Sequence, residues 1–237
     1  MSHFEQKKFV NIVVDELKKN NNFNNFSILD VGSYDVGGSI RDLFNKNDYT
    51  GVDIIEGPNV DFVINGSQLD KLNKKYDIVI SCECFEHAEN WNDVFLSMYD
   101  VCKDDGFVIF TCASRGRIEH GTLRTVNSDS PGTNGTYYKN IFKSDFKKKF
   151  NLNKLFNEFG LYYYIKSSDL YFIGKKGKNY DLNISSIREQ IKQIKNNNRK
   201  LKIFRIILSY LLSDKNFQDF TFFRRSLKKF FNFKNKS

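Results

Sequence analysis

The sequence of 237 residues predicts an α/β fold with one mostly parallel, seven-stranded sheet, helices on both faces and a helical C-terminal extension. Three observations predict this class. Short apolar runs alternate with amphipathic segments, as expected where strands and crossover helices follow one another. The first run, at 28–31, ends in a glycine-rich turn, and the second ends on Asp53. Two later runs, at 161–165 and 170–173, predict a hairpin that adds an antiparallel closing strand.

The other elements follow in order along the chain. Apolar residues at helical spacing between Phe9 and Leu17 predict an N-terminal helix that covers the sheet. Residues 40–44 mark the first crossover helix, and residues 94–102 mark a later one whose end is signalled by Gly106. The strands expected before the long loop are the runs at 27–31, 49–53, 60–64, 77–81 and 107–112.

A long polar loop and one more helix precede the hairpin. The loop spans residues 112–140, well beyond the roughly 12–15 residues that structureless connections in compact domains rarely exceed. Loops of this length are usually functional or disordered, so this one is a candidate for part of a site. Residues 146–159 then predict a helix that stops at Gly160.

Charge divides the chain at the linker GKKGKNYD into a domain of residues 1–177 and an extension of residues 178–237. The extension carries 15 Lys and Arg against 4 Asp and Glu, a net charge of +11. Since the whole chain is +9, residues 1–177 carry −2. Within the extension, residues 184–212 predict one or two basic amphipathic helices, and residues 220–234 predict a shorter one. A nucleic-acid partner is therefore not expected for the domain.

The extension places basic residues beside bulky apolar ones. This pattern is typical of helices that contact an anionic membrane surface, and also of helices that pack in a homodimer. The charged N-terminal segment lacks a signal-peptide core, and no apolar run approaches the ~20 residues needed to span a bilayer. The sequence therefore predicts a cytoplasmic protein, with peripheral membrane contact or dimerisation through the extension.

The glycine-rich turn distinguishes between two classes of nucleotide ligand. Gly32 is followed by Ser33 and Tyr34, so the second glycine of the dinucleotide pattern G-x-G-x-x-G is missing. The preceding Asp30 repels phosphate and suits a cationic ligand, such as an ammonium beside a sulfonium. Asp53 is placed to accept hydrogen bonds from ribose hydroxyls. The pattern favours S-adenosylmethionine over NAD.

From residue 26 to residue 177 the chain resembles the class I S-adenosylmethionine-dependent methyltransferases, which have a Rossmann-like fold. The resemblance rests on four motifs in order: the glycine-rich turn, Asp53, VDFVINGSQL, and YDIVISCECFEHAENW at 76–91. It implies that Asn65 reads the adenine amino group through its amide oxygen. The residues implied to bind the cofactor are Asp30, Gly32, Ser33, Asp53, Ile54, Asn65 and Glu83.

Two Glu-His pairs follow successive strands and are candidates for the chemistry. Methyl transfer to a hydroxyl needs a base near the acceptor, and histidine suits that task near neutral pH. His87 and His120 are the catalytic candidates. The long loop adds arginines and tyrosines that suit a polyhydroxylated or anionic acceptor. The residues expected to bind the acceptor are Glu86, Arg117, Glu119, Arg124, Tyr137 and Tyr138.

Metal binding is not expected, because the four cysteines lack zinc-knuckle spacing and no compact motif such as H-E-x-x-H is present. The leading interpretation is a methyltransferase that acts on a small polar or anionic acceptor. The acceptor atom is expected to be an oxygen of a sugar, a glycan precursor or a phosphorylated or phosphoramidate metabolite. Two alternatives stay open: an RNA methyltransferase, and a non-catalytic binding or scaffold protein with a methyltransferase-like fold.

Overall fold

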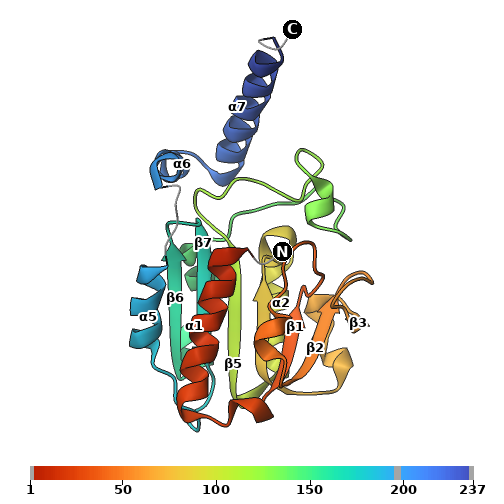
Figure 1. The fold of residues 1–237 in the computed structure, drawn as a ribbon, viewed down its shortest axis with the longest axis vertical. Coiled ribbons are helices and arrows are strands. Elements are labelled where there is room, and N and C mark those ends of the chain that lie inside the picture. Colours follow the sequence, from red (N-terminus) through yellow and green to blue (C-terminus); the bar gives the residue numbers. More distant parts are fainter. Residues whose placement is uncertain (1–2, 195–198, 235–237) are drawn as a thin grey trace.

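Seven strands form one sheet in the order β3-β2-β1-β4-β5-β7-β6 in the computed structural model, which describes residues 3–194 and 199–234 (Figure 1). The strands are β1 (Ser27–Val31), β2 (Asp48–Asp53), β3 (Phe62–Val63), β4 (Tyr76–Cys82), β5 (Cys102–Ala113), β6 (Glu158–Tyr164) and β7 (Asp169–Lys175). All neighbours pair in parallel except that β7 runs antiparallel to both β5 and β6. The predicted mostly parallel sheet with an antiparallel closing strand is confirmed.

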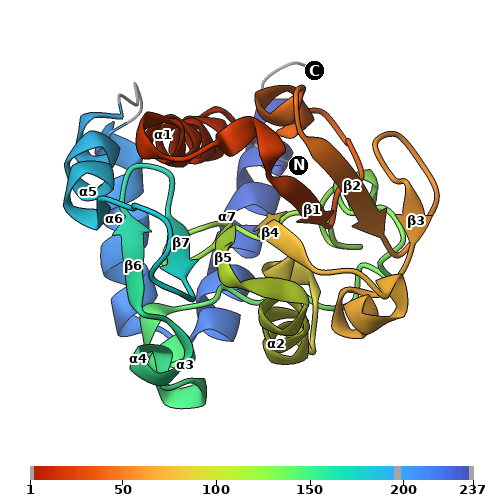
Figure 2. The ribbon, with the colours of Figure 1, turned by 90° about the horizontal axis from the view of Figure 1, so that it is seen from below.

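Helices cover both faces of the sheet (Figure 2). The helices are α1 (Phe4–Asn20), α2 (Trp91–Val101), α3 (Lys143–Lys149), α4 (Leu152–Leu155), α5 (Ile184–Gln193), α6 (Arg199–Leu211) and α7 (Asp214–Lys234). α1 and α5 pack on one face, whereas α2, α3 and α4 pack on the other. Ile28 belongs to the α1 core and the next residue, Leu29, to the α2 core. This alternation explains why the central strands are apolar at nearly every position.

The predicted helix at 146–159 is wrong, because this segment forms α3, α4 and the start of β6. Phe150 and Phe156 adopt extended backbone angles at the ends of the two short helices. The ring of Phe156 lies 5.2 Å from that of Phe172, and Gly160 pairs with Ile173 in the sheet. Aromatic packing in the α2 core determines these backbone angles, although the spacing of the rings also suited a helix.

The first crossover helix expected at 40–44 is also wrong, since only one 3-10 turn, Arg41–Phe44, forms there. Upstream, the amides of Gly37 and Gly38 both donate to Asp35 Oδ1, at 3.0 and 2.6 Å. This side-chain turn competes with helix formation and leaves too few residues for a full helix before β2.

The described residues of the extension form three helices. The two predicted between 184 and 212 are α5 and α6, whereas α7 is the longest helix, with 21 residues, and not a shorter one. α7 begins six residues before the predicted start, at Asp214, where Ser213 Oγ accepts a hydrogen bond from Asn216 N at 3.3 Å. Ile187 and Ile191 of α5 are buried in the α1 core, while α6 and α7 lie beyond the ends of the strands (Figure 1). Among the described residues, every helix is too short or too polar to cross a lipid bilayer.

Candidate functional site

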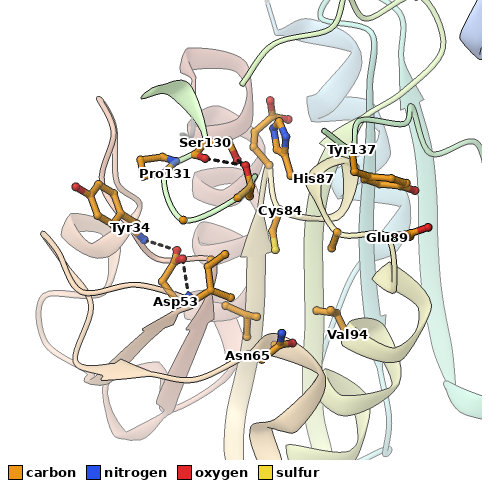
Figure 3. A pocket seen from close by; sticks show the side chains of 18 of the residues that line it. Tyr34, Asp53, Asn65, Cys84, His87, Glu89, Val94, Ser130, Pro131 and Tyr137 are labelled. Carbon is orange, nitrogen blue, oxygen red and sulfur yellow. Dashed lines mark hydrogen bonds between the residues drawn. The ribbon is translucent and has the colours of Figure 1, made fainter. Parts of the chain in front are cut away.

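A cavity of about 360 Å³ lies at the carboxyl ends of β1, β2 and β4 (Figure 3). Its walls come from the turns after these strands, from the start of the 3-10 helix Gly66–Leu72, and from residues 129–137 of the long loop after β5. Ligands of open parallel sheets bind at this edge. The predicted site residues that line the cavity are Gly32, Asp53, Ile54, Asn65, Glu83, His87 and Tyr137.

The turn after β1 approaches the turn after β4 so closely that it requires glycine. Gly32 has a φ of +83°, and a Cβ there would lie 3.0 Å from Cys84 Cβ. The amides of Gly32 and Ser33 both donate to Val52 O, at 2.9 and 3.0 Å. The backbone between β1 and β2 is therefore fixed in a shape that leaves room for a ligand.

Asp53 presents its carboxylate to the cavity at the end of β2 (Figure 3). The amide of Tyr34 donates to Oδ2 at 3.0 Å, and the amide of Ile54 donates to Oδ1 at 2.7 Å. A carboxylate has about four acceptor sites, so each oxygen can take a further hydrogen bond. Asp53 is thus oriented by the backbone and still able to accept from two hydroxyls.

Asp30 and Ser33 do not line the cavity. Asp30 lies on the α1 side of β1, where Tyr49 Oη donates to its carboxylate at 2.5 Å. Burial raises the pKa of Asp30 to about 6. Ser33 Oγ donates to Asn59 O at 3.0 Å. Both side chains are therefore engaged in contacts within the protein.

Asn65 lines the cavity, but its amide oxygen has other partners. Oδ1 accepts from Ser67 N at 3.0 Å and from Ser67 Oγ at 2.8 Å, which caps the 3-10 helix that follows. The oxygen expected to read an adenine amino group is therefore occupied. The remaining polar group of this side chain is the Nδ2 amide, a donor.

Residues 129–136 of the long loop line the cavity, together with Tyr34, Cys84 and Glu89. The sequence indicated that the loop forms part of a site, but none of these residues was among those expected to bind a ligand. Gly132 has a φ of +78°, and a Cβ there would lie 2.6 Å from Ile55 Cγ2 and 3.0 Å from Ile54 Cγ1. The loop tip thus rests on the end of β2. The small polar composition of this segment was the signal available in the sequence.

A buried ion cluster lies between the loop, β7 and the start of α1. The Arg117 guanidinium lies 3.1 Å from Glu83 Oε2 and 3.4 Å from Asp169 Oδ1. His3 Nε2 lies 3.1 Å from Asp169 Oδ2. Burial acts against ionisation, but Arg117 holds the pKa of Glu83 well below its usual range, and Asp169 and Glu5 raise that of His3 to about 9.

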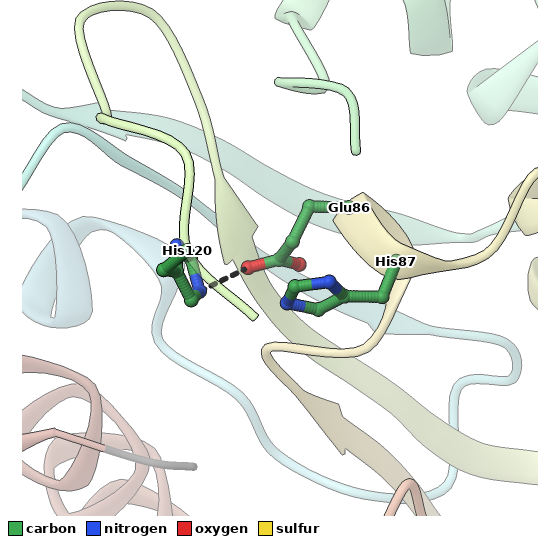
Figure 4. A group of neighbouring side chains, drawn as sticks. All are labelled: Glu86, His87 and His120. Carbon is green, nitrogen blue, oxygen red and sulfur yellow. Dashed lines mark ion pairs between the residues drawn. The ribbon is translucent and has the colours of Figure 1, made fainter. Parts of the chain in front are cut away.

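Glu86, His87 and His120 form a second cluster beside the first (Figure 4). His120 Nε2 lies 3.5 Å from Glu83 Oε2 and 3.9 Å from Glu86 Oε1. Burial and the charge of Glu83 raise the pKa of Glu86 well above its usual value. Burial, with a smaller effect of His120, lowers the pKa of His87 to about 3, so its imidazole is neutral near pH 7. Of the three residues, only His87 lines the cavity.

A second hollow, of about 380 Å³, adjoins the cavity at Asp129, which lines both. Its lining includes Arg117, Arg205 of α6 and Arg225 of α7. Arg205 Nε is buried without a hydrogen-bond partner among the described residues. Burial and the charges of Arg117 and Arg225 lower the pKa of Arg205. The carboxylates of Glu119 and Asp129 also line the hollow, but Glu119 is paired with Arg124, and Arg117 is paired with Glu83 and Asp169. Arg205 and Arg225 are therefore the cations that favour an anion here.

The other predicted acceptor residues lie outside the cavity. Arg124 is paired with Glu119, which is buried, and lies close to Asp219 of α7. Tyr138 is packed edge-on against the rings of both histidines, at 5.5 Å from His87 and 5.2 Å from His120. Glu119 lines the second hollow, whereas Arg124 and Tyr138 line neither the cavity nor the hollow and support the loop.

Two side chains of α7, Gln218 and Asp214, form hydrogen bonds with the loop. Gln218 Nε2 donates to Arg117 O at 3.0 Å, and its Oε1 accepts from Glu119 N at 2.9 Å. Asp214 accepts from the backbone and the side-chain amide of Asn140, at 3.0 and 2.9 Å. The segment that carries Arg117 and His120 is therefore held by the extension.

Comparison with known protein families finds one match. The family model of a methyltransferase domain matches residues 1–164. No curated protein matches this chain by sequence.

Three solved structures share the fold at low identity. The N-terminal domain of EvdMO1, solved in the presence of S-adenosylhomocysteine and D-fucose, is 10% identical over 75% of this chain and 85% of its own, with a TM-score of 0.51. The plantazolicin methyltransferase BpumL in complex with S-adenosylhomocysteine is 15% identical over 81% and 79%, with a TM-score of 0.50. The CurJ carbon methyltransferase is 10% identical over 73% and 54%, with a TM-score of 0.50.

Proposed function

The chain belongs to the class I S-adenosylmethionine-dependent methyltransferases, and we propose that it methylates an oxygen of a small hydroxylated acceptor that carries an anionic group. A sugar phosphate or sugar nucleotide is such an acceptor. The observation that carries the proposal is the junction of the cavity and the arginine hollow at Asp129. A molecule that spans this junction has its reacting end beside His87 and its charged end near Arg205 and Arg225.

The cavity residues fit the cofactor. Gly32 lines the cavity at a turn too tight for a Cβ, and Asp53 keeps acceptor sites for two ribose hydroxyls. Val36, Ile64 and Val94 add apolar surface for a flat ring system. When bound, S-adenosylmethionine supplies a methyl group that its sulfonium already activates.

The loop side of the cavity suits a hydroxylated acceptor. Ser130, Thr133, Thr136 and Tyr137 bring side chains with hydroxyl groups to its lining. Hydroxyls donate and accept, so they match sugar hydroxyls in either role. The hollow adds guanidinium groups, which bind phosphate in a bidentate manner.

Methyl transfer requires the acceptor oxygen to attack in line with the carbon–sulfur bond. A carbon–oxygen bond forms, the carbon–sulfur bond breaks, S-adenosylhomocysteine leaves, and the hydroxyl proton passes to water. His87 lines the cavity with a neutral ring, which hydrogen-bonds to the acceptor hydroxyl and orients it. Asp53 and the glycine turn contribute by holding the donor at a fixed place on the opposite wall.

The test is a screen for S-adenosylhomocysteine release, with each sugar phosphate paired with its dephosphorylated form. We expect Arg225→Ala to raise the KM of the phosphorylated acceptor by roughly 10- to 100-fold, the effect of losing one charge-assisted hydrogen bond, and to leave neutral acceptors unaffected. Lys228→Ala, an exposed cation on the same helix that does not line the hollow, is the control.

Three results would contradict the proposal. Equal KM changes for both acceptor forms would remove the hollow from acceptor binding. Release with RNA only would favour the RNA methyltransferase, and binding of S-adenosylhomocysteine without turnover on any acceptor would favour a scaffold.

A further inference from the structure

Three donor atoms converge beside the cavity, one each from Glu86, His87 and His120, all within 4.8 Å of one another (Figure 4). An ion that binds these donors tetrahedrally at about 2.1 Å holds its ligands about 3.4 Å apart. Binding would therefore draw the donors together by at most about 1.4 Å, a movement that side-chain rotations can supply. The 3-10 turn Phe85–His87 and the loop bring these side chains together.

Two of these side chains have buried atoms without a partner. Glu86 is fully buried; its Oε1 accepts from Ala113 N at 3.0 Å, but Oε2 has no hydrogen bond within the described ranges. His87 Nδ1 is likewise buried and unpartnered there. Unsatisfied buried polar atoms cost free energy, so they are rare unless a ligand completes them. Both atoms belong to the same three-residue cluster.

His120 makes a backbone contact that is typical of a metal ligand. Its Nδ1 lies 3.3 Å from Ile118 O, which can only accept a hydrogen bond, so this contact favours the tautomer with the proton on Nδ1. In that tautomer Nε2 has a free lone pair, and this atom lies 3.9 Å from Glu86 Oε1 and 3.5 Å from Glu83 Oε2. Histidine ligands commonly donate their other nitrogen to a backbone carbonyl in this way.

In the neighbouring cluster, a positive charge already compensates the charges of the carboxylates. His3, Glu83 and Asp169 also bring donors together, but the Arg117 guanidinium lies among them and pairs with both carboxylates. That cluster already contains a permanent cation. In the part of the chain that the structure describes, no Arg or Lys forms an ion pair with Glu86.

We propose that Glu86, His87 and His120 bind a divalent transition-metal ion beside the cavity, although no metal was expected from the sequence. Two imidazoles and one carboxylate are the ligand set of catalytic Zn²⁺ sites and of related Fe²⁺ sites, which keep positions open for a substrate. Because His87 lines the cavity, an acceptor there lies next to the site.

The ion gives the acceptor hydroxyl a route to lose its proton. A hydroxyl bound to a divalent cation ionises more easily, and its oxygen becomes the better nucleophile that methyl transfer needs. This consequence rests on the proposed function, whereas metal binding itself does not.

Titration of the full chain with Co²⁺ tests binding without any acceptor, because Co²⁺ held by nitrogen and oxygen ligands absorbs visible light. We expect one equivalent to bind and the Tm to rise by roughly 5–10 °C at a 100-fold excess over Kd. His120→Asn and Glu86→Gln should each weaken binding by about 100-fold or more. His3→Asn, in the cluster that contains Arg117, is the matched control and should bind Co²⁺ as the parent does.

Two outcomes overturn the site: a parent chain that binds neither Co²⁺ nor Zn²⁺ by absorbance and calorimetry, or ligand variants that bind like the parent. Binding of S-adenosylhomocysteine shows that each variant is folded, and Glu86→Gln preserves volume if His120→Asn fails to fold. A parent chain that transfers methyl groups but binds no metal refutes the site and leaves the proposed function intact. Metal binding without methyl transfer to any acceptor supports the site and refutes the function.

Discussion

The two walls of the cavity are built differently. The wall at the strand ends is local: Gly32 and Asp53 are fixed by backbone hydrogen bonds between the turn after β1 and the end of β2. The loop wall depends on distant residues, since Gln218 of α7 holds Arg117 and Glu119 from about a hundred positions away in the chain. We therefore expect cofactor binding and acceptor binding to respond to different mutations.

The largest expected effect lies on the local wall. Asp53→Ala removes the acceptors for two ribose hydroxyls and should weaken S-adenosylhomocysteine binding by roughly 100-fold or more, since hydrogen bonds to charged groups contribute about 1.5–3 kcal/mol each. Calorimetry measures the change. Asp48→Ala, at the exposed opposite end of the same strand, is the control and should bind like the parent. Parent-like binding by Asp53→Ala would show that the cofactor does not use this wall.

The next effect lies on the loop wall. Gln218→Ala deletes the two hydrogen bonds of the Gln218 side chain to the loop and should cost about 1–3 kcal/mol locally, because Glu119 N loses its partner and Arg117 O loses one of two donors. Hydrogen exchange in residues 114–142 should rise and methyl transfer should fall, with S-adenosylhomocysteine affinity unchanged. Lys215→Ala, exposed on the same helix, is the control. Equal losses of cofactor and acceptor binding would end the distinction between the two walls.

A smaller effect concerns Asp30, which sits behind the local wall. Its pKa is raised to about 6 by burial, so the folded state binds its proton more tightly than the unfolded state does. Stability should therefore fall as pH rises from about 4 to about 6, by at most about 3 kcal/mol. Asp30→Asn should remove this loss and keep cofactor affinity. Denaturant unfolding across this pH range measures it, and an unchanged pH profile in the variant would contradict the assignment.

The smallest effect concerns the outer side of α6 and α7, which faces away from the loop. Leu211 and Phe223 are 76% and 61% exposed, and Arg224 and Lys228 are exposed nearby. Such a surface binds anionic lipid at about 1 kcal/mol per cation. The full chain should sediment with phosphatidylserine vesicles and not with neutral ones, and Leu211→Asp with Phe223→Asp should reduce binding. A chain that ignores vesicles and forms a dimer through these residues would identify a homodimer surface.

The same contrast explains what could be predicted from the sequence. The parallel pairing of β1 with β2 and the positions of Gly32 and Asp53 follow from local pattern, because an apolar run, a glycine turn and a terminal acid specify one such unit. The face of the sheet on which Asp30 lies could also be predicted, since successive side chains of β1 point to opposite faces and Val31 points to the other face. Resemblance to a family gave it a ligand role that its contact with Tyr49 does not support.

The loop wall could not be predicted in this way. Arg117 was expected to bind an acceptor, yet its partners include Asp169, 52 positions later, and no local pattern encodes that pairing. The start of α7 was also predicted too late in the chain, so its contact with the loop could not be predicted. The sequence indicated His87 and His120 as separate catalytic candidates, one in each Glu-His pair, but not that both lie beside Glu86 in the folded chain.

The contact of Gly132 with Ile54 and Ile55 has a consequence for the timing of turnover. The loop tip lines the cavity together with Asp53, so we expect exchange of spent cofactor for fresh to involve movement of that tip. Loop openings of this kind take microseconds to milliseconds and often limit the rate of an enzyme. The dwell time of the spent cofactor is then governed by a few glycines and small polar residues, which evolution can adjust without touching the atoms that react.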